Sequence, residues 1–302
     1  MKLFIKKTLL LIVSFIFLIY CYGFIIDNVF RNGSYYKSQW INSLTNKNVD
    51  YAIIGNSRAS LLSLNEKNVK YINLAEDGIG MGLTYLQLYS YYKKGNKAKY
   101  VLLQGDYKSF NKTDDSRRSP RWIPYFNDSI VYSILKNEHK SFKNFKYLPA
   151  VNYSIFKYDW GFSSIMNNIF EFKKSPWGEY GYYNVCNKYV NNGPKGSVDF
   201  DKFKQDMYWL DKLNELSKNN GSKLIIFTAP YFQMIDSVTN TQNFKNSLLE
   251  KSIKYLDFSR EFENNNSLFR DNNHLNCYGV EKFSPIIVRK LKETDSTYYK
   301  HN

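Results

Sequence analysis

The sequence predicts an α/β protein with a doubly wound, flavodoxin-like parallel sheet of about five strands, preceded by one N-terminal transmembrane helix. Three observations indicate this. Short apolar runs alternate with longer amphipathic segments, the chain opens with a long uncharged stretch, and the alternation is interrupted once. The interruption, at about 108–200, is rich in Trp, Tyr, Phe, Ser and Asn, and we interpret it as a large aromatic-rich insertion.

The uncharged N-terminal stretch is Thr8–Ile26, and its 19 residues are enough for a helix to cross a hydrocarbon core about 30 Å thick. It is longer than the apolar region of a cleavable signal peptide, and no small-residue cleavage site follows it. The positive-inside rule then predicts a single-pass protein of the cell membrane, with the N-terminus cytoplasmic and the rest extracytoplasmic. The basic residues before the span are Lys2, Lys6 and Lys7. We expect a transmembrane signal-anchor at 1–27 and a juxtamembrane segment at 28–48.

The remaining chain, 49–302, is expected to form one α/β domain that contains the insertion at 108–200. Strands are predicted at 49–54, 71–74, 100–104, 223–230 and 254–259, because each is a short apolar run. Helices are predicted near 80–94, 128–138, 162–172, 201–219 and 240–252. A final helix is predicted to begin at Ser284 and Pro285, a pair typical of a helix N-terminus.

The composition excludes some classes of protein. Hydrophobic residues make up 43% of the chain, which is not typical of disorder. The net charge is +15, but the basic residues are scattered and form no nucleic-acid-binding motif, so we expect no nucleic-acid partner. Cys186 and Cys277 both follow the span and could pair, although their spacing does not demand it. No Cys/His cluster is present, so no metal is expected.

Ligands of doubly wound sheets bind beyond the carboxyl ends of the strands. The polar and glycine residues expected there are Asn56, Ser57 and Arg58 after the first strand, Gly78 and Gly80 after the second, Asp106 after the third, and Asp271 and His274 after the last. Because parallel strands end at one edge of the sheet, residues from the front and the back of the chain can meet there.

Nucleophilic catalysis by serine needs a base and a group that orients the base. The chain has three histidines, of which His139 lies in the insertion and His301 is the penultimate residue. His274 follows Asp271 by three residues, a spacing that lets one turn bring the carboxylate to the imidazole. Ser57 alone could be a helix cap, Asp271 a turn residue and His274 a surface residue. Their chain order on these strand ends predicts a catalytic triad.

Other residues at this edge have two interpretations each. Gly78 and Gly80 could let backbone N–H groups stabilise an oxyanion, together with the N–H of Ser57. Arg58 could bind an anionic group of a substrate, or it could pack at a helix start. Asp106 could cap a loop or contact the substrate.

The sequence "GNSRAS" after the first strand, a glycine after the second, a strand ending "QGD" and a late Asp-x-x-His together resemble the SGNH, or GDSL-like, hydrolase superfamily. The resemblance covers about 49–107 and 201–292, and implies that Ser57 is the nucleophile, His274 the base and Asp271 its orienter. Two positions depart from the family pattern. Asn56 replaces an aspartate, and Tyr107 replaces an oxyanion-binding asparagine, for which Asn56 or Asn73 could substitute.

Such blocks behind an N-terminal anchor are similar to the membrane-tethered branch of the superfamily, which includes proteins of alginate O-acetylation and teichoic-acid D-alanylation. This resemblance implies an extracytoplasmic serine esterase or O-acyltransferase, acting without a cofactor on acyl (O-acetyl) esters of a cell-envelope polysaccharide, beside a membrane-bound O-acyltransferase. The alternative is a catalytically inactive scaffold or binding protein for the polysaccharide or for that partner. In the insertion region Trp122, Trp160 and Trp177 could then stack on sugar rings, or they could be core residues.

Overall fold

The computed structural model describes residues 1–33, 35–106, 109, 119–138, 177, 179–182, 185–190, 207–233 and 238–299. The chain divides into two compact units, Met1–Ser43 with Asp114–Ser175, and Leu44–Thr113 with Pro176–Asn302. The middle of the insertion therefore groups with the N-terminal segment, whereas the sequence suggested one domain with an insertion. The helix expected at 162–172, His139 and Trp160 lie outside the described residues.

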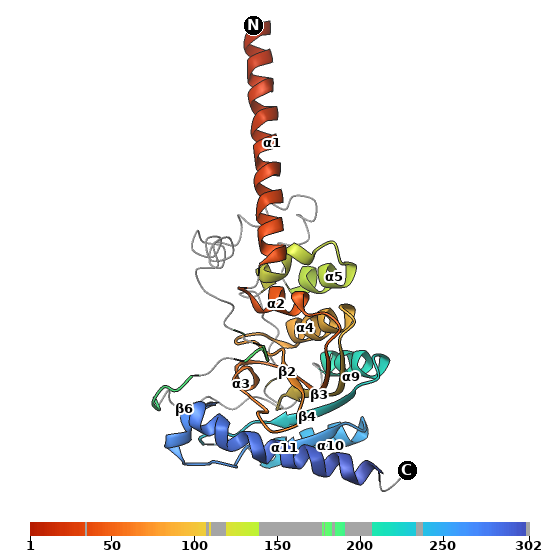
Figure 1. Cartoon of the computed structure of the whole chain (residues 1–302). Coiled ribbons are helices and arrows are strands. Elements are labelled where there is room, and N and C mark those ends of the chain that lie inside the picture. The colour runs from red at the N-terminus through yellow and green to blue at the C-terminus, as the bar shows by residue number, and fades with distance from the viewer. Residues whose placement is uncertain are drawn as a thin grey trace. The chain divides into compact units, whose positions relative to one another are not determined.

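The first unit contains α1 (Lys2–Asn32), α2 (Lys37–Ser43), the 3-10 helix η2 (Ser119–Tyr125) and α5 (Ser129–Glu138), the last as predicted. By length and composition the long helix α1 (Figure 1) could cross a membrane. The side chains of its apolar stretch are almost all exposed. The last turn of α1 is packed against the rest of this unit: Phe30 is buried, and its carbonyl accepts a hydrogen bond from Gln39 Nε2 at 2.5 Å. Trp122 is also buried, which makes it a core residue of this unit.

The second unit is built on five parallel strands in the order β2-β1-β3-β4-β5. The strands are β1 (Asn48–Ile54), β2 (Tyr71–Asn73), β3 (Lys97–Gln104), β4 (Lys223–Thr228) and β5 (Lys254–Asp257). The helices that connect them are α3 (Ser57–Ser60), α4 (Met81–Lys93), α9 (Tyr208–Asn219) and α10 (Val238–Glu250). This strand order confirms the predicted doubly wound, flavodoxin-like sheet.

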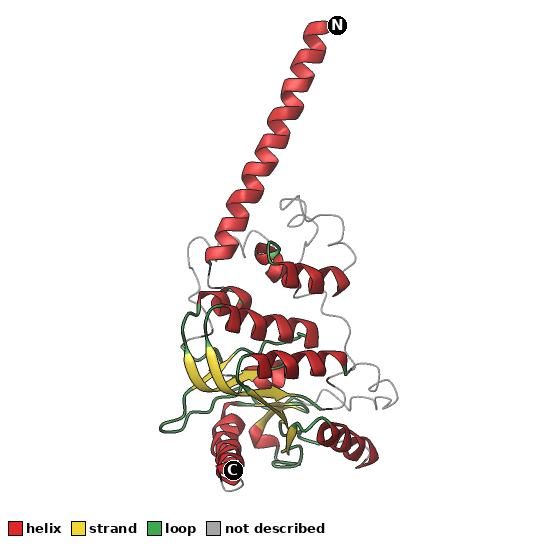
Figure 2. Ribbon diagram, turned by 90° about the vertical axis from the view of Figure 1, so that its right-hand side faces the viewer, coloured by secondary structure: helices red, strands yellow, loops and turns green. Residues whose placement is uncertain are grey.

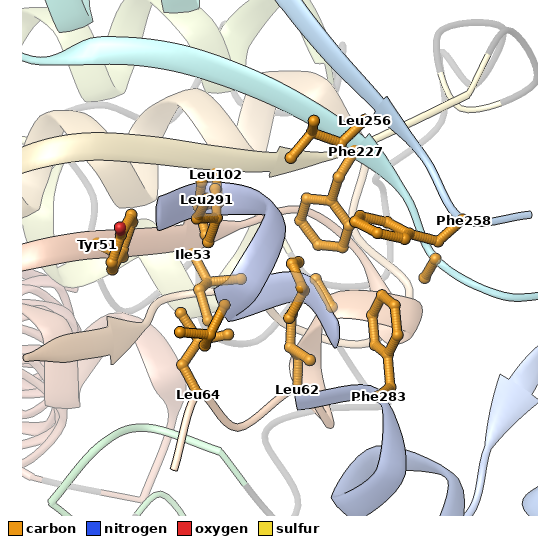
Figure 3. Packing of buried hydrophobic residues seen from close by; sticks show 14 of the residues in the cluster. Tyr51, Ile53, Leu62, Leu64, Leu102, Phe227, Leu256, Phe258, Phe283 and Leu291 are labelled. Carbon is orange, nitrogen blue, oxygen red and sulfur yellow. The ribbon is translucent and has the colours of Figure 1, made fainter. Parts of the chain in front are cut away.

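Helices cover both faces of this sheet, with α4 and α9 on one side and α10 and α11 (Cys277–Tyr299) on the other (Figures 1 and 2). Successive strand residues point to opposite faces, which is why the strands read as continuous apolar runs. On the α11 face Ile53, Leu102 and Phe227 pack in one cluster with Leu291 (Figure 3). Burial of such side chains stabilises the unit by about 1.5–3 kcal/mol each.

The prediction that the last helix begins at Ser284 is wrong, because α11 begins at Cys277. The side chain of Asn276 caps it: its Oδ1 accepts a hydrogen bond from the Gly279 N–H at 3.0 Å. Pro285 therefore lies inside the helix, where it removes one backbone donor. The apolar face of α11, which includes the fully buried Ile287, compensates for this loss by packing on the sheet.

A small antiparallel hairpin precedes α11 and was not predicted. It consists of β6 (Phe269–Asp271) and β7 (His274–Leu275), and the 3-10 helix η4 (Asn266–Leu268) leads into it. Strands of two or three residues are too short to show a period in the sequence. The hairpin joins Asp271 and His274 across a turn of two asparagines, so it shapes the site described next.

Candidate active site

The turn that follows β1 determines where Ser57 lies. Gly55 has φ +130°, and a Cβ on it would come within 3.0 Å of the carbonyl oxygen of Gln104 at the end of β3. Only glycine adopts this conformation without strain, so the chain can turn sharply beside β3. Asn56 then caps α3, since its Oδ1 accepts a hydrogen bond from the Arg58 N–H at 3.1 Å. Ser57 is thus the first residue of a helix that starts directly at the carboxyl end of a buried strand.

Ser57, His274 and Asp271 form a continuous hydrogen-bonded relay. Ser57 Oγ lies 2.7 Å from His274 Nε2, although 217 positions separate the two residues in sequence. His274 Nδ1 lies 2.8 and 2.9 Å from the two carboxylate oxygens of Asp271. The structure therefore brings together the three residues that the sequence selected, in the order serine, imidazole, carboxylate. The side chains of His274 and Asp271 are only 15% and 16% exposed.

The surroundings of Asp271 keep its carboxyl group ionised. Partial burial on its own would raise its pKa, but hydrogen bonds from the His274 ring and the Asn273 N–H lower it below the usual range. Asp271 Oδ1 also accepts the backbone N–H of His274 at 3.0 Å. Because an ionised carboxylate only accepts hydrogen bonds, the proton of the neutral imidazole belongs on Nδ1. Nε2 then carries the lone pair that can accept the proton of Ser57.

Arg58 and Asp106 form a buried ion pair at the edge of the sheet. Their side chains are 7% and 5% exposed, and Arg58 Nη1 lies 2.9 Å from Asp106 Oδ2. Arg58 Nη2 donates to the Ala229 carbonyl, and the guanidinium stacks 3.6 Å from the ring centre of Tyr231. Tyr231 Oη in turn donates to Asp106. We name these four residues the Arg58 clamp. It joins the ends of β1, β3 and β4 beside Ser57, and this favours the packing interpretation of Arg58.

Burial alone would raise the pKa of Asp106. The charge of Arg58 and the hydrogen bonds from Tyr231 and Ser109 outweigh this and hold its pKa below the usual range. Asp106 Oδ1 accepts the Ser109 N–H and hydroxyl, both at 2.9 Å, so the carboxylate also caps the loop after β3, as one of the two sequence interpretations proposed.

Gly78 and Gly80, which the sequence proposed as oxyanion donors, lie in the loop between β2 and α4. Gly78 has φ +70° and Gly80 caps α4. The loop that carries them is hydrogen-bonded to the turn after β1, because the Glu76 N–H donates to the Gly55 carbonyl at 3.2 Å. Their role as donors stays a prediction, as does that of the Asn56 amide. Asn73 is not available, because its Nδ2 donates to the carbonyls of Ala59 and Leu62 at 2.7 and 2.8 Å.

The remaining residues that the sequence singled out are an aromatic position after β3, a tryptophan of the insertion and two cysteines. Tyr107 lies outside the described residues. Trp177 is mostly buried, which favours a packing role over an open stacking face. Cys186 and Cys277 form a disulfide, the pairing that the sequence left open. Among the described residues, no cluster of three or more His, Cys, Asp or Glu side chains could hold a metal ion.

No protein-family model and no curated protein matches the chain. The fold and the geometry of the site therefore carry the functional argument. The sequence placed Tyr231 at a strand end but gave it no role; it lies three residues after β4, where ligand and support residues gather. Sequence reasoning missed Tyr189 and Asn272, which contact each other beside the relay.

Proposed function

We propose that this chain is a membrane-anchored serine esterase or O-acyltransferase that acts outside the cytoplasm on acyl esters of a cell-envelope polysaccharide. The observation that carries the proposal is the relay from Ser57 Oγ through the imidazole of His274 to Asp271, with heavy-atom distances of 2.7 and 2.8 Å. These distances lie within hydrogen-bond reach, which a nucleophile and its base require.

The chemistry follows from the protonation states. His274 Nε2 takes the proton of Ser57 as Oγ attacks the ester carbonyl, and Asp271 stabilises the imidazolium that forms. The tetrahedral oxyanion collapses, His274 returns the proton to the leaving alkoxide, and an acyl-serine remains. A water molecule or a sugar hydroxyl then loses its proton to His274 and attacks the acyl-serine, which releases the acid or the transferred ester. Each backbone donor that stabilises the oxyanion would contribute about 100- to 1000-fold to kcat.

Two observations support an extracytoplasmic location. Three lysines precede the apolar part of α1, which favours a cytoplasmic N-terminus. The Cys186–Cys277 disulfide is typical of proteins that fold in an oxidising compartment. The choice of a polysaccharide ester as substrate, and of a membrane-bound O-acyltransferase as partner, rests on the resemblance of the sequence blocks to the membrane-tethered branch of the SGNH superfamily.

A serine-reactive fluorophosphonate probe tests the nucleophile directly. The full chain, purified in detergent, should be labelled at Ser57, and Ser57→Ala should lose labelling and at least about 1000-fold in ester turnover. Ser267→Ala is the matched control, because Ser267 is exposed and its hydroxyl donates to the neighbouring Asn265. Equal labelling of wild type and Ser57→Ala would reject the proposal.

A second function, a scaffold without catalysis, is favoured by one observation: the amide of Asn73 is engaged elsewhere and so cannot complete an oxyanion hole. Absence of labelling in well-folded protein would support the scaffold. If labelling occurs, single-turnover measurement of the acyl-serine with and without a polysaccharide acceptor separates the two enzymes. A transferase moves the acyl group to the acceptor, whereas an esterase releases the free acid in both cases.

A further inference from the structure

A segment from the far side of the insertion lies along the catalytic hairpin. We name residues 185–190 the strap. Its Val190 N–H donates to the carbonyl of Arg270 at 2.8 Å, and its Val185 carbonyl accepts the Cys277 N–H at 2.8 Å. As the strap runs forward from 185 to 190, its partners run backward from 277 to 270. The strap therefore lies antiparallel to the stretch that carries Asp271 and His274, and is fixed at both ends of it.

Between these ends, Tyr189 contacts the turn of the hairpin itself. Its hydroxyl donates to Asn272 Oδ1, and its ring lies 4.7 Å from the ring of Phe232, centre to centre. The Phe232 N–H donates to the Asn272 carbonyl at 3.3 Å. Asn272 stands directly after Asp271 and two residues before His274, so these contacts fix the peptide between the carboxylate and the imidazole.

The disulfide fastens the strap to the start of α11. Cys277 is three residues after His274, and Cys186 is in the strap. Cys186 is exposed, so a dithiol in solution can reach the bond. Within the strap, Asn187 and Lys188 are exposed. Reduction would consequently remove the covalent attachment at one end of the strap, where only the hydrogen bond between the Val185 carbonyl and the Cys277 N–H would remain, and would leave the parallel sheet and its core untouched.

We infer that the strap positions the Asp271–His274 pair through Tyr189 and the Cys186–Cys277 disulfide, and that reduction of this disulfide switches the proposed activity down. In the switching reaction a dithiol gives two electrons and two protons. The S–S bond breaks, Cys186 and Cys277 become thiols, and the dithiol becomes its cyclic disulfide. The inference rests on the proposed function only for its kinetic readout; the positioning of the imidazole can be measured without turnover.

The kinetic test uses the full chain and a small chromogenic ester, p-nitrophenyl acetate. Because a misplacement of about 1 Å can lower a rate about 100-fold, we expect kcat to fall about 10- to 100-fold in reduced protein and in the double variant Cys186→Ser/Cys277→Ser, with KM nearly unchanged. Reoxidation should restore wild-type kcat, and dithiothreitol should not lower kcat further in the double variant. Tyr189→Phe removes one hydroxyl and should lower kcat by about 3- to 10-fold. Tyr208→Phe, at a 59% exposed tyrosine of α9, is the control and should keep wild-type kcat.

A spectroscopic test keeps the inference separate from the proposed enzyme activity. A proton on Nδ1 that is bound to a carboxylate gives a strongly deshielded NMR signal, and the chain has only three histidines to assign. The signal of His274 should broaden or disappear on reduction and in the double variant, even in Ser57→Ala protein. An unchanged signal together with an unchanged kcat in reduced, folded protein would overturn the inference. Loss of fluorophosphonate labelling in oxidised protein that keeps the His274 signal would instead count against the proposed function alone.

Discussion

Asp106→Asn tests the Arg58 clamp. The change keeps the size of the side chain but removes the charge that faces Arg58, whose side chain is only 7% exposed. Breaking a buried ion pair by removing one partner costs about 3–5 kcal/mol, because the remaining charge stays buried without compensation. For a compact unit of about 200 residues, 1 kcal/mol corresponds to about 2–4 °C in Tm, so Tm should fall by about 6–20 °C.

Thermal unfolding of the detergent-purified chain, followed by circular dichroism, measures this fall. The matched control is Glu293→Gln, which breaks the exposed pair of Lys290 and Glu293, with side chains 51% and 53% exposed. Exposed pairs contribute about 0–1 kcal/mol, so the control should change Tm by only a few degrees. If Asp106→Asn unfolds at the same temperature as Glu293→Gln, the clamp does not stabilise the strand ends.

The Arg58 clamp also predicts that the folding stability of the protein depends on pH. The pKa of Asp106 is lower in the folded protein than in the unfolded chain, so its ionised form contributes stability. That contribution is fully present above the unfolded pKa of about 3.9 and is lost as the pH falls through the lower folded value. The Tm difference between wild type and Asp106→Asn should therefore be constant near pH 6 and shrink below about pH 4. A difference that grows in acid would contradict the sign of the shift.

Three further predictions concern the start of α11, the hairpin and the anchor. Gly279→Ala should prevent stable folding, since the Cβ of the new alanine would lie 2.1 Å from the Leu268 carbonyl oxygen. A soluble variant with wild-type Tm would contradict this prediction. Asp271→Asn should lower kcat by about 10⁴-fold with little change in KM, because the amide no longer holds the imidazole in the required tautomer. Stopped-flow ester cleavage measures this loss of kcat, and a loss of less than tenfold would argue against the relay. The full chain should stay with membranes in alkaline carbonate and be released by detergent, because α1 is long and apolar enough to span a membrane. Release by carbonate alone would contradict a membrane-spanning α1.

The sheet could be predicted because β1, β3 and β4 each contain an apolar run buried on both faces and bounded by polar residues or glycine. Ile53 and Ile54, for example, are both fully buried before the chain turns at Gly55. The start of α11 could not be predicted in the same way. Ser284 and Pro285 have the local chemistry of a helix start, but the packing of α11 on the sheet outweighs that preference.

The site was predicted where chain order and strand ends suffice, and missed where tertiary partners decide. Ser57 and His274 were paired from their positions alone, since parallel strands end at one edge. Arg58 was left with two interpretations because its partner Asp106 lies 48 positions away, and a single sequence does not reveal such a pairing. The contact of Tyr189 with Asn272 depends in the same way on a segment 83 positions distant.

The long interval between Ser57 and His274 has a consequence for biogenesis. A chain that is threaded across a membrane from its N-terminal end presents the serine long before the imidazole emerges. Until then the hydroxyl has no base and is an ordinary, unreactive alcohol. For the proposed enzyme, a partly translocated chain would therefore be unreactive toward esters, and activity would arise only once His274 reaches the edge of the sheet beside Ser57.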